Sequence, residues 1–363
     1  MPRPLSSALL AAYLVGLLLV APASHALDPT PTARVLAGLS TDHAQAGEDK
    51  AGVLEGYTRK VAQLWDTYDK QIAGPMGEWA RGELTRTPGE TIFYPFAGPD
   101  FPTAQILYPD AGRYVLVALQ TGGRVPDMSA MAKDRLNAYL RTFRSGWESF
   151  TQRGFYDTDD LKRDTGDKGV LEGITPALMA FAVRLGYAID KVEPMRVGAA
   201  GELEVHPGDR SSVGTWDSVR LTLRSAAGQT VLLDYLHLDL SDGYLAKHDP
   251  ERRFITAMSK QRVVTKAASH LMQKPFFSII KGAILENAPS LWQDETGIDY
   301  AELAERFTVA LYGKFTKANK LFIKGIQRSL ATAYKTRKDI EPLPFKVGYK
   351  KESGSCVQVA VRK

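Results

Sequence analysis

Apolar residues along the chain recur at helical spacing in three segments. Between residues 53 and 72 they fall three and four positions apart, which predicts an amphipathic helix. The same spacing predicts a second helix over 129–147, with Ser129 as its N-cap. Residues 174–185 are apolar nearly all round and precede Gly186, which predicts a buried helix that a glycine terminates.

Other segments have the pattern of strands. Residues 91–96 form a short apolar run, and residues 114–119 form a continuous one that ends before two glycines. Continuous burial predicts a central strand, on which we expect Val115, Val117 and Leu119 to be buried. Alternating residues at 219–223 and an apolar return at 231–240 predict a hairpin. Further strands are expected at 307–312, 345–349 and 357–361.

This mixture favours an α+β fold over a doubly wound sheet. We expect a mixed or antiparallel sheet with a central apolar strand near 114–119, flanked by amphipathic helices. Residues 27–50 lack periodicity and are interpreted as a linker. An N-terminal α/β part (51–197) and a C-terminal α+β part (215–363) follow, with the glycine-rich stretch 198–214 as the candidate hinge; the alternative is one continuous domain.

The N-terminus has the layout of a secretory signal peptide. Arg3 precedes an apolar run over residues 8–20, and Ser24 and Ala26 are small residues at the positions that signal peptidase requires. The run is shorter than the roughly 18 residues of a retained anchor. We expect cleavage after Ala26 (signal peptide 1–26) and a soluble, periplasmic or secreted protein without a transmembrane segment in the mature chain.

Composition excludes several classes of protein and site. The 363 residues include 46 Lys and Arg, 41 Asp and Glu, and one cysteine, with 44% hydrophobic residues, which is ordinary for a globular protein. Cys356 alone makes neither an internal disulfide nor a zinc cluster. Phosphate-binding loops, dinucleotide-binding glycines, the G-x-S-x-G elbow and the H-E-x-x-H motif are absent from the sequence. We therefore expect no cofactor and no metal.

Positive charge concentrates near the C-terminus. Residues 306–351 hold twelve Lys and Arg against Asp339 and Glu341. If the segment is helical, five of these residues form one stripe: Lys314, Lys317, Lys320, Lys324 and Arg328. Such a stripe suits an anionic envelope component, such as a phospholipid, lipopolysaccharide or a glycan. The alternative is a solvated helix face, and nucleic acid is not an expected partner of an exported protein.

Three segments together resemble a family of uncharacterised exported bacterial proteins. They are Tyr94-Pro-Phe-Ala-Gly-Pro-Asp100, Lys266-Ala-Ala-Ser-His-Leu-Met272 and Gln293-Asp-Glu-Thr-Gly-Ile298. The family has serine where this chain has Ala97, Asp-Ser where it has Glu295 and Thr296, and proline where it has Asp299. The resemblance covers about 90–360 and implies no activity. The missing serine argues against a nucleophile beside Gly98.

The same segments contain the candidate catalytic residues. If they meet in one cleft, Asp100, Lys266, Asp294 and Glu295 form a cluster of carboxylates and a lysine, which suits either acid–base chemistry or an ion-pair network. Asp100 is also placed to cap a short helix. The sequence favours a non-enzymatic binding or envelope-associated protein; the alternative is a metal-independent hydrolase that uses an Asp/Glu pair with the nearby lysine.

Overall fold

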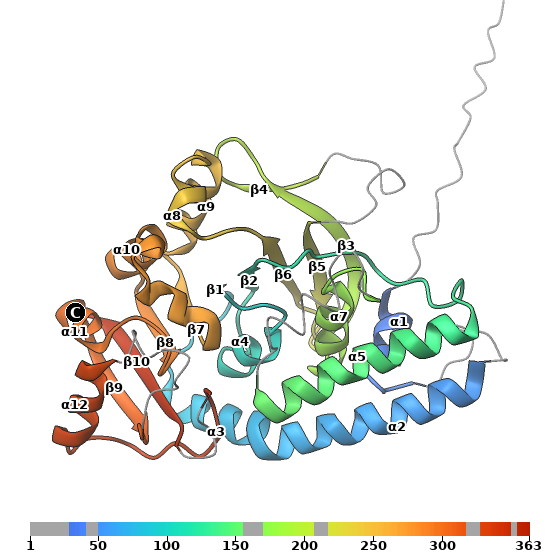
Figure 1. Ribbon diagram of the computed structural model, residues 1–363, viewed down its shortest axis with the longest axis horizontal. Helices are drawn as coiled ribbons and strands as arrows, with labels where there is room; N and C mark the ends of the chain where they lie inside the picture. The colour runs from blue at the N-terminus through green and yellow to red at the C-terminus, as the bar shows by residue number, and fades with distance from the viewer. Residues whose placement is uncertain (1–28, 41–49, 155–169, 207–216, 317–326, 350–353) are drawn as a thin grey trace, which may run out of the picture.

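One mixed β-sheet runs through the whole protein (Figure 1). The structure, a computed structural model, describes residues 29–40, 50–154, 170–206, 217–316, 327–349 and 354–363. Within these ranges the sheet has ten strands in the order β4-β3-β5-β6-β2-β1-β7-β8-β10-β9. They are β1 (Thr91–Pro95), β2 (Arg113–Ala118), β3 (Ala188–Val197), β4 (Leu203–Val205), β5 (Ser218–Arg224), β6 (Thr230–His237), β7 (Arg262–Thr265), β8 (Ser290–Asp294), β9 (Phe307–Gly313) and β10 (Cys356–Arg362).

The centre of the sheet is parallel and its two flanks are antiparallel. Strands β6, β2, β1, β7 and β8 all run the same way. Strands β5, β3 and β4 extend one side by antiparallel pairing, and β10 and β9 extend the other. The predicted α+β fold with a mixed sheet is confirmed, as is the central position of the strand near 114–119.

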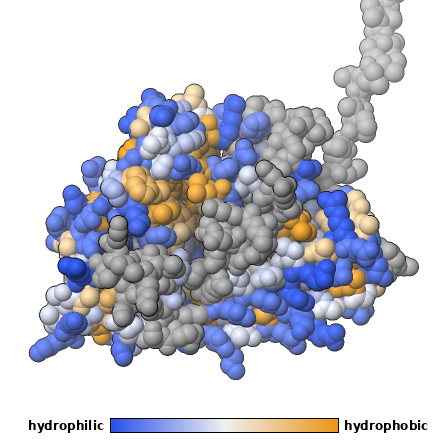
Figure 2. All heavy atoms as spheres, viewed as in Figure 1, coloured by the Kyte–Doolittle hydropathy of each residue, from blue (hydrophilic) through white to orange (hydrophobic). Residues whose placement is uncertain are grey.

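Helices cover both faces of the sheet. One layer consists of α1 (Pro29–Leu36), α2 (Ala51–Tyr68), the π-helical turn η3 (Asp69–Ala73), α3 (Gly74–Glu83), α4 (Phe101–Leu107), α5 (Lys133–Arg153) and α7 (Thr175–Arg184). The other consists of α8 (Asp242–Leu245), α9 (Asp249–Met258), the 3-10 helices η4 (Ala267–Gln273) and η5 (Pro275–Phe277), α10 (Ser278–Asn287), α11 (Tyr300–Arg306) and α12 (Arg328–Thr336). Apolar side chains gather on the surface over α8 and α10 (Figure 2).

Strand β2 shows why its apolar run is continuous. Tyr114 and Leu116 pack into the core of the first layer, whereas Val115 and Val117 pack into that of the second. Successive side chains of a strand point to opposite faces, so a strand buried on both faces needs apolar residues at every position. Leu119 lies beyond the end of β2 and is 52% exposed, so its predicted burial is wrong.

The predicted helices are present with changes at their ends. Helix α2 continues through η3 into α3, and α7 is buried and followed by Gly186 at a φ of +88°. Helix α5 begins after Ala132, so the prediction of Ser129 as its N-cap is wrong. The Ser129 hydroxyl instead donates to the carboxylate of Asp127 in the preceding turn.

The interpretation of residues 27–50 as a linker is wrong for the part that the structure describes. Helix α1 packs against α7 and β3, and its Thr30 hydroxyl bonds to the carbonyl of Ile189. The hydroxyl of Tyr57 donates to the carbonyl of Leu36 at 2.5 Å. A two-turn helix is too short for a clear periodicity, and these contacts hold it in place.

The two predicted parts share one sheet. Strand β1 lies between β2 of the first part and β7 of the second, and β2 pairs with β6. In the candidate hinge, residues 198–201 form the turn of the β3–β4 hairpin. The described strands of both predicted parts therefore belong to one continuous sheet.

The C-terminal strands are confirmed except one. Strands β9 and β10 match the predicted 307–312 and 357–361, and they pair with each other. The strand expected at 345–349 is absent, because the amides of Val347 and Tyr349 donate to the side chains of Ser355 and Glu295 instead of a neighbouring strand. The predicted signal peptide lies outside the described residues.

Candidate functional site

Three loops meet at the carboxyl ends of the central parallel strands. The chain leaves β1 toward β2 through α4, and it leaves β7 in the opposite direction, toward β8, through α10. Neighbouring strands whose connections diverge in this way form a topological switch point, where α/β sheets commonly bind ligands. Asp100 lies on the first loop and Lys266 directly follows β7, so both residues belong to this point of the fold.

Asp100 and Lys266 form a buried ion pair. The Lys266 Nζ lies 2.7 Å from Asp100 Oδ2, and the two side chains are 3% and 2% exposed. Each of the two buried charges is stabilised by the other, because burying an unpaired charge in the protein interior costs several kcal/mol of folding free energy. The convergence that the sequence suggested for these two residues is therefore observed.

Neighbouring groups occupy the remaining bonding positions of the pair. Tyr94 and Thr103 donate their hydroxyl hydrogens to the Asp100 carboxylate at 2.8 Å each. The Thr103 amide donates to Oδ1, so Asp100 also caps α4 as predicted. Lys266 donates to the Thr103 hydroxyl and to the carbonyl of Gly154, at the end of α5. The pair thereby connects β1, β7, α4 and α5.

Asp294 is the last residue of β8, and its carboxylate contacts the backbone of the loop that follows β7. Its Oδ2 accepts from the amide of Ala267, and its Oδ1 accepts from the amide and hydroxyl of Thr296. The Thr296 hydroxyl lies 2.7 Å from that of Ser269, which extends the chain of hydrogen bonds. Burial raises the pKa of the Asp294 carboxyl, while the bonds from Thr296 and Ala267 and the charge of Lys266 oppose that rise.

Glu295 points away from the ion pair. Its carboxylate accepts from the amide of Tyr349 at 3.0 Å, and a side chain on Gly348 would collide with it. The preceding Gln293 holds the loop in shape by exchanging two hydrogen bonds with the backbone of Ile298. Three of the four candidate catalytic residues therefore come together, and Glu295 belongs to a separate contact.

Two residues in this region have an unusual backbone. Phe96, directly after β1, and Ala267, after Lys266, have φ angles of +61° and +57°. A residue with a side chain loses about 1–2 kcal/mol in this left-handed conformation. The hydrogen bond from Ala267 to Asp294 holds one of them. Strain of this kind is typical of functional sites and of tightly determined loops.

We define the switch-point cluster as Tyr94, Asp100, Thr103, Lys266 and Asp294. It is enclosed: each of its five side chains is buried, and each makes a hydrogen bond to another described residue. A substrate could reach Lys266 or either carboxylate only by displacing these bonds. These hydrogen bonds join the loops to one another and leave the charged groups of the cluster no open contact with a ligand.

The basic stripe is described only at its two ends. Lys314 is exposed in an irregular stretch after β9, and Arg328 is exposed at the first position of α12. Lys317, Lys320 and Lys324 lie outside the described residues. Residues 314–316 are not helical, so the helical geometry does not apply to the first position, and a common binding surface stays a prediction.

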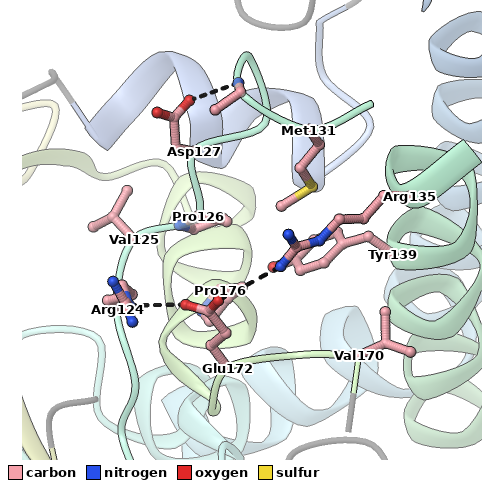
Figure 3. A pocket seen from close by; sticks show the side chains of 11 residues that line it. Arg124, Val125, Pro126, Asp127, Met131, Arg135, Tyr139, Val170, Glu172 and Pro176 are labelled. Atoms are coloured by element: carbon pink, nitrogen blue, oxygen red, sulfur yellow. Dashed lines mark hydrogen bonds and ion pairs between the residues drawn. The ribbon is translucent and has the colours of Figure 1, made fainter. Parts of the chain in front are cut away.

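An open pocket lies on the first helical layer, at the loop that follows β2 (Figure 3). We call it the α5–α7 pocket; it has a volume of about 210 Å³. Its lining residues are Arg124, Val125, Pro126, Asp127, Ala130, Met131, Arg135, Tyr139, Val170, Glu172 and Pro176. None of them was a candidate in the sequence. Two signals were present: the pair of glycines that ends the β2 run, and the spacing of four between Arg135 and Tyr139 on one helix face.

Backbone contacts between the glycine pair Gly122-Gly123 and the dipeptide Glu172-Gly173 shape this pocket. Residues 122–123 lie against residues 172–173, and the amide of Thr175 donates to the carbonyl of Gly122. Gly123 has a φ of +74°, and a Cβ there would lie 1.8 Å from the carbonyl oxygen of Glu172. Only glycine allows this approach of two backbones.

Gly123→Ala is therefore expected to destabilise the protein by about 3 kcal/mol or more, from overpacking together with backbone strain. The matched control is Gly228→Ala, because Gly228 has a φ of +78° and open space around its Cβ position. That change should cost only about 1–2 kcal/mol. Urea unfolding of both variants measures the difference, and equal losses would contradict the close approach.

The described residues show neither a metal site nor a membrane-spanning helix. Among them, His, Cys, Asp and Glu form no group of three or more that could hold a metal ion. Helices long and apolar enough to cross a membrane are also absent from these ranges. Comparison of the chain with protein-family models, with curated proteins and with solved structures finds no match.

Proposed function

We propose that the chain is an exported, non-enzymatic binding protein of the bacterial cell envelope. The observation that carries the proposal is the contrast between its two candidate sites. The switch-point cluster is enclosed and mutually bonded, whereas the α5–α7 pocket is open and lined by both charged and apolar side chains. Export rests on the signal-peptide pattern over residues 1–26.

In this proposal the switch-point cluster has a structural role. A buried ion pair whose partners are also hydrogen-bonded fixes the arrangement of the groups that it joins. Here these groups are the loops after β1 and β7 and the end of α5. An anionic envelope component stays the partner expected for the basic residues near the C-terminus, which are separate from the α5–α7 pocket.

One preparation tests export and binding together. The protein is purified from the exported fraction, where its intact mass should correspond to a chain that begins at Leu27. It is then mixed with envelope glycans, anionic lipids and small organic anions in a thermal-shift screen. We expect a ligand that raises the melting temperature and is recovered chemically unchanged. A mass that includes residues 1–26 would contradict cleavage after Ala26, and absence of the protein from the exported fraction would contradict export.

A metal-independent hydrolase is the second candidate, and two observations favour it. Burial raises the pKa of Asp294 near a lysine, which is the condition for a general acid. Two buried atoms on the strands that flank β8, Thr265 Oγ1 on β7 and Gln358 Oε1 on β10, have no hydrogen-bond partner among the described residues. If wild-type protein converts a ligand of the screen and Asp294→Asn does not, the hydrolase replaces the binding protein.

A further inference from the structure

The α5–α7 pocket and the switch-point cluster lie at opposite ends of α5. Arg135 and Tyr139 stand near the beginning of the helix, whereas the Gly154 carbonyl that Lys266 contacts directly follows its end. Fifteen residues separate Tyr139 from Gly154, which is about 22 Å along a helix axis. A ligand in the pocket is therefore remote from the cluster.

Two arginines supply the charge of the pocket. Glu172 lies between them, with its carboxylate 2.8 Å from Arg124 Nε and 3.9 Å from Arg135 Nη2 (Figure 3). The arginine side chains are 49% and 69% exposed. A guanidinium has five N–H donors in a fork that matches carboxylate or phosphate oxygens, so one glutamate leaves donors of both arginines available to an anion.

The other charges near the pocket are already engaged. Asp127 accepts from the amide and hydroxyl of Ser129 and from the amide of Ala130, and these bonds lower the pKa of its carboxyl. Lys50, which also lowers that pKa, donates to the carbonyl of Ser129. The pocket is lined by two arginines and two acidic residues, and Asp127 is already held by hydrogen bonds within its own turn. Glu172 is therefore the one lining carboxylate that pairs with Arg124 and Arg135.

Tyr139 gives the pocket a polar group that lacks a partner. Its side chain is 3% exposed, and its hydroxyl has no hydrogen-bond partner among the described residues. Arg135 and Tyr139 both point from α5 toward Glu172 and Pro176 (Figure 3). Burial raises the pKa of the Tyr139 hydroxyl, with the charge of Glu172 adding to the effect, so it remains an O–H donor at neutral pH. Buried hydroxyls normally have partners, and a ligand oxygen would provide one.

The remaining walls are apolar and the space is small. Side chains of Val125, Pro126, Met131, Val170 and Pro176 line it. The volume of about 210 Å³ exceeds the ~150 Å³ of an apolar cavity that accommodates benzene. A single ring with a short charged substituent fits these dimensions, whereas a lipid chain or an oligosaccharide does not.

We propose that the α5–α7 pocket binds a small organic anion with an aromatic or branched apolar body. The anionic group pairs with Arg124 and Arg135, one of its oxygens accepts from Tyr139, and the body packs between Val125, Met131 and Pro176. This inference rests on the proposed binding function and names its ligand class.

Isothermal titration calorimetry of the full exported chain tests the assignment. The probes are benzoate and 3-phenylpropionate for the carboxylates, phenyl phosphate for the alternative anion, and benzyl alcohol as the neutral analogue. We expect at least one anion to bind saturably at millimolar concentration or below, and benzyl alcohol to bind at least tenfold more weakly. Absence of saturable binding by all three anions would overturn the proposal.

Two pairs of variants locate the binding. Arg135→Gln should weaken it about tenfold, because the anion loses one of two guanidinium partners, whereas Arg141→Gln, exposed on the same helix and outside the pocket, should not. Tyr139→Phe should weaken it about fivefold with no fall in melting temperature, since the hydroxyl removed has no partner in the free protein. Tyr114→Phe, which removes a bonded hydroxyl, should lower the melting temperature and keep the affinity.

The outcomes separate this inference from the proposed function. If an anion binds intact but neither Arg135→Gln nor Tyr139→Phe weakens it, the pocket assignment is wrong and the binding function stands. If an anion is converted in a reaction that Asp294→Asn abolishes, the binding function is wrong, and the titrations with the pocket variants still decide where the anion binds.

Discussion

Lys266→Met is expected to destabilise the protein by about 3–5 kcal/mol, because it leaves the carboxylate of Asp100 buried without its cation. The methionine keeps much of the volume of the lysine stem, so the loss reports the charge more than the packing. It also removes the donor to the Thr103 hydroxyl and the Gly154 carbonyl. Since folded domains are stable by about 5–15 kcal/mol, the variant should unfold at much lower denaturant concentration.

A control lysine and a double variant show that the effect belongs to the ion pair. Lys281 pairs with Glu302 at 2.9 Å, but both side chains are partly exposed, so Lys281→Met should cost less than about 1 kcal/mol. Asp100→Asn combined with Lys266→Met removes both charges, and its loss should be smaller than the sum of the two single losses. A loss below about 1 kcal/mol for Lys266→Met alone would contradict the pairing.

Val117→Asp is expected to prevent folding. Val117 is fully buried on β2, paired with Pro95 of β1 and Leu236 of β6, and it packs into the core of the second helical layer. A carboxylate at this position would have no counter-charge, and burying it costs several kcal/mol, comparable with the whole stability of a domain. Expression should yield aggregated or unfolded protein by circular dichroism.

Leu119→Asp is the matched control for this change. Leu119 lies two residues further along the same segment and is 52% exposed. The charge there remains in water, so the free energy of unfolding should change by no more than about 0.5 kcal/mol. If Val117→Asp were folded with the melting temperature of the wild type, the position of β2 at the centre of the sheet would be wrong.

The elements that the sequence predicts best are those whose pattern is local. Strand β2, the β5–β6 hairpin and helix α7 each have a pattern of burial within one short segment. The parallel pairing of β1 with β7 could not be predicted, because the partners are far apart in the chain and no turn fixes their register. The hydrogen bonds from the amides of Val347 and Tyr349 to side chains also could not be predicted, because a pattern of apolar residues carries no information about them.

The candidate sites also differ in how far the sequence could predict them. Asp100, Lys266 and Asp294 were suggested because they lie in the three segments that carry the family resemblance, and only Asp100 follows a predicted strand. Strands β7 and β8, which were not predicted, bring the other two residues to the same edge of the sheet. Glu295 has the same sequence argument, but the course of its loop turns it toward Tyr349. The pocket brings together the loop after β2, the start of α5 and the residues before α7, so that only the three-dimensional fold defines it.

A crystal structure of the exported protein with 3-phenylpropionate distinguishes binding in the α5–α7 pocket from binding at the switch-point cluster. We expect the carboxylate between Arg124, Arg135 and the Tyr139 hydroxyl, with the 2.7 Å contact between Lys266 and Asp100 unchanged. A ligand lodged between Lys266 and Asp100, with the loops after β1 and β7 parted and the α5–α7 pocket empty, would contradict this expectation.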